Sequence, residues 1–216
     1  DRLEKIADDI VEHFVARGYL GKGMVISIDR LTTVRMYEKV QRYWKMKIET
    51  LKAQLVSADD SELESIKETI DFMEETDMAV VISTSGDEVT FFEKHEIDIV
   101  PHRKRMKDED LDEKYKDPHD PFRLVFVCAM WRTGFDAPAC STIYLDRPMR
   151  NHTLMQTIAR ANRVFGEKNN GLIVDYVGIF RSLQKALAIY GTGRGGTLGP
   201  GEMPVQSKEE LIEDLK

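Results

Sequence analysis

The sequence predicts an α/β protein built on a parallel sheet with helices on both faces. Short runs rich in aliphatic residues alternate with longer segments whose apolar residues recur at helical spacing. Most of the short runs are continuously apolar, which is typical of strands that are covered on both sides. About six strands are expected: Met24–Ile28, Ala79–Ser83, Ile97–Val100, Leu124–Cys128, Thr142–Leu145 and Leu172–Val174.

The composition indicates a globular protein with a sizeable core. Of the 216 residues, 42% are hydrophobic and 32% are charged. No apolar run approaches the roughly 18 residues that span a bilayer, and two cysteines are too few for a disulfide framework. We therefore expect a cytoplasmic protein without a membrane partner. The net charge of -7 means that any contact with nucleic acid needs a local basic patch.

Helical patterns fill the gaps between the predicted strands. The first helix covers about Arg2 to Ala16 and carries apolar residues on one face. Leu31 to about Val56 predicts a long helix, and Ser61 with Glu64 three residues later predicts the start of another. These two helices would form a charged hairpin, near 31–77, between the first two strands. We interpret it as a solvated surface feature, with a partner-binding role left open.

The tail changes character at Gly191. A Gly-rich linker is expected over 191–206, followed by the start of a helix over 207–216. Because the chain ends within that helix and opens on Asp1, we expect a piece of a longer protein. The segment Gly191–Gly196 matches G-x-G-x-x-G, but a helix precedes it and Pro200 follows, so it lacks the context of a dinucleotide site.

Two further kinds of site are not supported by the sequence. The phosphate loop G-x-x-x-x-G-K-[ST] occurs nowhere in the chain. His95 and His102 do not form a tight metal-ligand spacing with the two cysteines, so no metal site is predicted.

One predicted helix presents a polar face. Asn151 can cap its start, and Gly166 lies just beyond its end. Gln156, Arg160 and Arg163 are spaced i, i+4 and i+7, so they share a face. The other side is apolar and can pack on the sheet. The face is either a solvated surface or a site for an anion.

A second segment follows the predicted strand Leu124–Cys128. It contains Arg132, Thr133, Gly134 and Asp136. In open α/β sheets, ligands bind outside the carboxyl ends of the strands. The segment is therefore either a binding loop or a simple connection.

Together, the two segments resemble motifs V and VI of superfamily 2 helicases, in order and spacing. Motif V has G-x-D after a strand, and motif VI has Q-x-x-G-R-x-x-R; the departure here is Ala159 in place of Gly. The phrases Asp98–Arg103, Met130–Pro138 and Gly171–Tyr176 are similar to those of type I restriction motor subunits. The resemblance runs from about Asp1 to Tyr190.

This resemblance implies a RecA-like domain over residues 1–190, the second of two motor lobes that hold ATP between them. Arg163 would be an arginine finger and Arg160 a second phosphate contact, while Gln156 would orient the helix or the nucleotide. Gly134 and Asp136 would line the nucleotide edge. Mg²⁺ and the phosphate loop would be supplied mainly by the first lobe. The isolated chain is therefore expected not to hydrolyse ATP.

The same resemblance implies double-stranded DNA as a partner, together with the first lobe and with methyltransferase and specificity subunits. Arg132 and Thr133 could face either the nucleotide or the DNA backbone, and Arg30, His102 and Arg103 could contact the DNA. The basic cluster Arg103-Lys104-Arg105-Lys107 is the most plausible phosphate-facing patch, and the alternative is a solvated turn.

Two other functions remain open. The chain could belong to another superfamily 2 motor, such as an RNA helicase or a chromatin-remodelling enzyme. A preference for single-stranded RNA over double-stranded DNA would favour such a motor. It could instead be a non-catalytic RecA-like scaffold, in which case ATP turnover by the full protein would not depend on Arg163. A small-molecule enzyme that uses the Gly-rich tail fails because that tail lacks a preceding strand.

Overall fold

The computed structural model describes residues 1–17, 21–128, 138–149, 153–154, 157 and 171–180. Contacts divide the chain into a first unit, Asp1–Ile179, and a second unit, Phe180–Lys216. The predicted linker over 191–206 and the helix over 207–216 lie outside the described residues. The helices and strands, all in the first unit, are α1 (Arg2–Ala16), β1 (Lys22–Ser27), α2 (Arg30–Gln54), α3 (Asp60–Glu75), β2 (Asp77–Val81), α4 (Glu88–Glu93), α5 (Val100–Asp108), α6 (Leu111–Lys116), β3 (Phe122–Val127), β4 (Cys140–Asp146) and β5 (Leu172–Asp175).

Within the described residues, the strands form one five-stranded sheet in the order β2-β3-β1-β4-β5, and every pairing is parallel. Neighbouring residues of β1 point to opposite faces, yet Met24 and Val25 are both fully buried. Both faces of the central strand are therefore covered. This architecture confirms the predicted α/β class and is consistent with a RecA-like fold.

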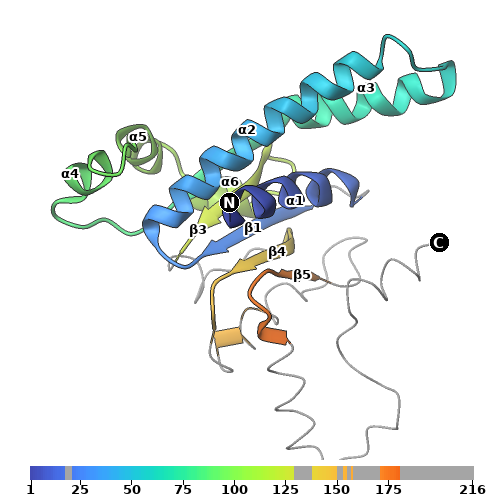
Figure 1. Ribbon diagram of the computed structural model, residues 1–216. Helices are drawn as coiled ribbons and strands as arrows, with labels where there is room; N and C mark the ends of the chain where they lie inside the picture. Colours follow the sequence, from blue (N-terminus) through green and yellow to red (C-terminus); the bar gives the residue numbers. More distant parts are fainter. Residues whose placement is uncertain (18–20, 129–137, 150–152, 155–156, 158–170, 181–216) are drawn as a thin grey trace, which may run out of the picture. The chain divides into compact units, whose positions relative to one another are not determined.

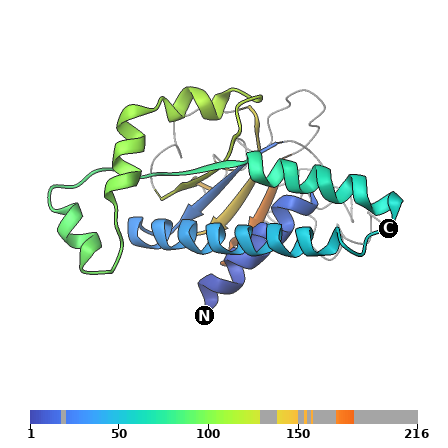
Figure 2. The same ribbon diagram turned by 90° about the horizontal axis from the view of Figure 1, so that it is seen from above.

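Helices α1 and α2 pack together on one face of the sheet (Figures 1 and 2). Asp1 and Asp29 cap them by accepting hydrogen bonds from the backbone N–H groups of Leu3 and Thr32. The rings of Phe14 and Trp44 lie 5.9 Å apart between the two helices. The predicted apolar face of the first helix is thus part of the core.

The predicted helical hairpin is present as α2 and α3. Its second helix begins at Asp60, one residue earlier than expected, and the Asp59 carboxylate accepts a hydrogen bond from the backbone N–H of Glu62. The indole Nε1 of Trp44 donates to the carbonyl oxygen of Met73 at 2.9 Å. This buried contact joins the two helices where they pass over the sheet.

The expectation of a strand over Ile97–Val100 is wrong. Ile97 to Ile99 form an irregular segment, and α5 begins at Val100. Pro101 has the fixed backbone that suits a first helical turn, and the Asp98 carboxylate accepts from the Val100 N–H. Ile97 and Ile99 are buried in the core, so their apolarity reflects packing and not a strand.

Candidate functional site

All five described strands end at the same edge of the sheet, where a parallel α/β fold binds its ligands. Strand β3 ends at Val127 and β4 at Asp146, and both pair with β1. The two motif segments therefore follow, in sequence, strands that flank the centre of the sheet. Most of the predicted site residues lie outside the described residues: Arg132, Thr133, Gly134, Asp136, Gln156, Arg160 and Arg163.

A buried carboxylate, that of Glu88, organises the part of this edge beyond β2. Only 8% of this residue is exposed. It accepts two hydrogen bonds from Arg103, from Nε at 2.5 Å and from Nη2 at 2.6 Å. A third bond, at 3.3 Å, comes from the backbone N–H of Ser85. This bidentate pair is a strong, geometrically specific contact.

Arg103 has little capacity left for an external ligand. Its remaining N–H groups donate to the carbonyl oxygens of Ile82 and Ser83, each at 2.7 Å, and contact the sulfur of Met106 at 3.7 Å. A guanidinium has five N–H donors, and all five have acceptors here. The geometry therefore gives Arg103 an internal role, which holds α5 against the end of β2.

Arg30, at the start of α2, lies on the open side of the same cluster. Its Nη1 donates to the Ser85 hydroxyl at 2.7 Å and lies 3.5 Å from the Glu88 carboxylate. Residues 83–87 form an exposed loop after β2 with three hydroxyl side chains and Gly86. One carboxylate thus faces two guanidiniums beside three exposed hydroxyl groups, and the same loop also carries the exposed Asp87 carboxylate. The guanidinium and hydroxyl donors suit a phosphate oxygen, whereas the second carboxylate opposes its binding.

His102 points elsewhere. Its ring makes an edge contact with Tyr37 of α2, with 5.0 Å between the ring centroids. Burial lowers the pKa of His102, and the pull of Asp98 only partly opposes this shift. The imidazole is therefore mainly neutral at pH 7 and adds no positive charge to a phosphate-facing patch.

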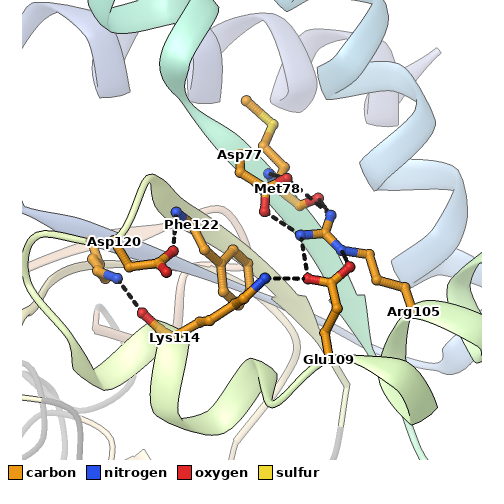
Figure 3. A network of polar contacts seen from close by, with 8 residues as sticks. Asp77, Met78, Arg105, Glu109, Lys114, Asp120 and Phe122 are labelled. Atoms are coloured by element: carbon orange, nitrogen blue, oxygen red, sulfur yellow. Dashed lines mark hydrogen bonds and ion pairs between the residues drawn. The ribbon is translucent and has the colours of Figure 1, made fainter.

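The basic cluster of α5 divides into inward and outward side chains. Figure 3 shows Arg105 at the amino end of β2, where it binds the Asp77 carboxylate, the Met78 carbonyl and Glu109. Lys104 and Lys107 are exposed. The predicted patch of four cations is thus reduced to two exposed lysines.

A further arginine lies between the central strands. Arg147 donates to the carbonyl oxygens of Ile28 and Cys128, at 3.2 and 2.9 Å, and so links the ends of β1 and β3 to the residue after β4. Beside it, the buried Asp146 carboxylate binds Arg2 of α1. These contacts fix the points from which the two motif segments depart.

Sequence reasoning missed Glu88 and Arg147 as organising residues. The spacing of Ser85 and Glu88 is that of a capping box, which could have indicated the bond from the Ser85 N–H to the Glu88 carboxylate. Arg147 had no such signal, since its acceptors are carbonyl groups of two other strands.

The described part of the chain contains neither a metal-ligand cluster nor a membrane-spanning helix. There, no group of three or more His, Cys, Asp or Glu side chains is arranged to hold a metal ion. None of the described helices is both long and apolar enough to cross a membrane.

Known proteins resemble this chain closely. The family model for type I restriction enzyme subunit R domain 3 matches residues 24–178. The HindI endonuclease subunit of a type I restriction enzyme from Haemophilus influenzae is 37% identical over 202 residues, which cover 90% of this chain and 17% of that protein. A Methanocaldococcus jannaschii protein described as the type I restriction enzyme endonuclease subunit MjaIXP is 32% identical over 219 residues, covering 100% of this chain and 16% of its own length.

A fragment structure described as an HsdR subunit of a type I restriction enzyme, from Vibrio vulnificus, aligns with 82% of this chain and 28% of that chain. Its TM-score is 0.45 and its sequence identity is 16%. The chain spans about one sixth of the length of the curated relatives it matches. Because the family match covers more than half of the chain, this protein belongs to the type I restriction enzyme subunit R family and contains its domain 3.

Proposed function

We propose that this chain is the second motor lobe of an ATP-dependent translocase of double-stranded DNA, within the motor subunit of a type I restriction enzyme. The family match carries this proposal, since it covers the strands that precede both motif segments. The relatives are described as endonuclease subunits, which supports an enzymatic parent and a multi-subunit complex. The first lobe and the methyltransferase and specificity subunits would be its partners.

In this proposal, Arg163 and Arg160 stabilise the phosphate groups of ATP that is bound against the first lobe. A planar guanidinium stays charged and bonds two phosphate oxygens at once. Gln156, Gly134 and Asp136 would line the same cleft. ATP would supply the phosphoanhydride bond whose cleavage drives movement. Mg²⁺ would be held mainly by the first lobe.

The described geometry bears most directly on DNA binding. Arg30 and the hydroxyls of residues 83–85 form an exposed donor set at the carboxyl edge, and Glu88 and Arg103 hold this set in place. Contacts of this kind to the DNA backbone carry no sequence information, which suits a motor that moves along any sequence. Arg132 and Thr133 would extend the donor set.

The test is ATP turnover by the full-length protein in its complex, with double-stranded DNA. Arg163→Ala should lower kcat by about 10³-fold or more, the scale of an arginine finger. DNA affinity should stay within about twofold, because the residue is assigned to the nucleotide and not to the DNA. Lys94→Ala, at an exposed position after α4, is the control and should change neither value.

Other outcomes favour the alternatives. Unchanged turnover in Arg163→Ala would favour a non-catalytic scaffold. Stimulation by single-stranded RNA in place of duplex DNA would favour another kind of superfamily 2 motor.

A further inference from the structure

The hairpin of α2 and α3 is longer than the sheet requires. The 25 residues of α2 span about 37 Å, whereas the seven residues of β4 span about 23 Å. Both views show the free ends of the two helices extending past the strands (Figures 1 and 2). We call residues 52–69 the arm. No described side chain in the arm is buried, whereas Leu51 and Ile70, which flank it, are.

The root of the arm is firmly anchored. Besides the bond from Trp44 to Met73, Phe72 stacks on Phe14 of α1 at a centroid distance of 6.3 Å. Lys52 and Glu74 form an ion pair at 2.7 Å across the two helices. Because its root is packed in the core, the arm is held in a fixed direction and can present a surface at a distance from the sheet.

The tip of the arm carries an exposed apolar side chain among polar ones. Val56 is 90% exposed, and Leu55, Leu63 and Ile66 are partly exposed. Beside them lies a hollow of about 570 Å³, lined by Gln54, Ser57, Ala58, Glu62, Ser65 and Ile66. Two helices alone leave one side of their shared seam uncovered, so the tip can accept a side chain from a third element.

The outer surface of α3 is acidic. Glu64, Glu68, Asp71 and Glu75 are spaced i, i+4, i+7 and i+11, so they form one exposed stripe. Of these four, only Glu75 has an ion pair in the described part of the chain, with Arg123 at 2.5 Å. Like charges at this spacing destabilise a helix. A cationic partner would remove that repulsion.

We propose that the arm docks on a protein surface that carries lysine and arginine side chains around an apolar pocket, in a part of the restriction complex outside this chain. Val56 would enter the pocket, and the stripe would meet the cations. Phosphate groups of DNA would be repelled by the stripe. A second copy of this chain is disfavoured by its net charge of -7. The relatives are about six times longer than this chain, so ample protein surface lies outside it.

Photo-crosslinking tests the occupant directly. Val56 is replaced by benzoylphenylalanine in the full-length protein, the complex is assembled from purified subunits, and the captured product is mapped after irradiation. The expected product is a protein segment outside residues 1–216, with lysine or arginine near the captured site. Capture of DNA, capture of a second copy of this chain, or no capture would each overturn the proposal.

Charge reversal tests the role of the stripe. In Glu68→Lys/Asp71→Lys, the new lysines form i,i+4 pairs with Glu64 and Glu75, so α3 should be as stable as before or more stable. The crosslink from position 56 should nevertheless fall at least tenfold. The control, Glu93→Lys/Asp108→Lys, makes the same change in net charge at exposed positions of α4 and α5 and should leave the yield within twofold. Equal yields in the two variants would overturn the proposal.

This inference does not depend on the motor function. If the arm docks but Arg163→Ala leaves ATP turnover unchanged, the docking surface stands and the proposed chemistry fails. If Arg163→Ala abolishes ATP turnover but position 56 captures no protein partner, the docking surface is rejected and the proposed motor chemistry stands.

Discussion

The most unusual single residue is Lys22, whose amine lies inside the protein at the amino edge of β1. The residue is 2% exposed, and its Nζ donates to the carbonyl oxygen of Lys114 at 2.7 Å. Burial lowers its pKa to about 8, and the nearby Asp120 and Asp117 oppose the shift only in part. A charged ammonium is therefore less stable here than in water.

This shift predicts how stability depends on pH. Between about pH 8 and 10.5, Lys22 holds a proton in the unfolded chain and has lost it in the folded chain. Because the unfolded state binds more protons in this range, the free energy of unfolding should rise with pH, by up to about 1.4 kcal/mol per pH unit. Urea unfolding at several pH values should show this rise in the wild type and not in Lys22→Met. An equal slope in both proteins would contradict the assignment.

A second prediction for a single residue concerns Ser27 and the stability of the fold. Its hydroxyl is fully buried at the end of β1, and no described group forms a hydrogen bond with it. A buried polar group without a partner costs about 1–3 kcal/mol. Ser27→Ala should therefore raise the free energy of unfolding, by about 1 kcal/mol once the lost volume is included.

The matched control is Ser141→Ala. Ser141 is equally buried, but its hydroxyl donates to the Lys22 carbonyl oxygen and accepts from Arg17. Loss of these bonds should lower stability by about 1–2 kcal/mol. If both variants lose stability, the Ser27 hydroxyl has a partner after all.

At the scale of elements, α5 closes the outer edge of the sheet. Strand β2 is an edge strand, and an uncovered edge offers free backbone groups to other chains. Arg103 binds carbonyls just beyond the carboxyl end of β2, and Arg105 binds the Met78 carbonyl near its amino end. Two arginines of one short helix thus secure both ends of the strand.

Arg103→Ala should therefore destabilise the protein strongly. It leaves the largely buried Glu88 carboxylate without its bidentate partner, a loss on the order of 3 kcal/mol. Arg103→Lys should recover little, since an ammonium cannot match the five-donor fork. Lys104→Ala, on the exposed side of the same helix, should stay within about 0.5 kcal/mol. Thermal unfolding of the three variants checks this order, and equal losses for Arg103→Ala and Lys104→Ala would refute it.

At the scale of the whole molecule, the proposed role as a second motor lobe predicts that this chain alone does not hydrolyse ATP. The sequence has no phosphate loop, so this chain lacks the group that would hold the triphosphate. The purified chain should release no phosphate from ATP above background, with or without duplex DNA. Turnover that persists in Arg163→Ala would contradict the motor chemistry proposed here.

The charge of the molecule is unevenly distributed along the hairpin. Seven acidic residues and one lysine lie in α3, whereas α2 carries seven basic and two acidic residues. Lysines of α2 are partly neutralised by acidic residues of α1 and α3, as in the pairs Lys47–Glu12 and Lys52–Glu74. The outer stripe of α3 has no such partners in the described residues except at Glu75. The surface that remains acidic is therefore the exposed stripe of α3 before Glu75.

The sequence by itself determined the α/β class, five of the expected strands, and the hairpin of α2 and α3. These features follow from the spacing of apolar residues and from helix caps. Both are local patterns that can be read within a single stretch of chain. The family also followed from short motif phrases. Local patterns failed at Ile97–Val100, where apolar side chains entered the core from an irregular segment before α5.

Only the tertiary structure decided what the charged residues do. Arg103 and Arg105 lie in one basic run, yet their partners are Glu88, Asp77 and the carbonyls of β2 and the residues after it, which are distant in sequence. Lys22 likewise becomes a buried amine only because α6 covers it. The sequence determines which side chains are charged. Their solvation and their partners depend on which segments meet in space, and the packing of the whole sheet decides that.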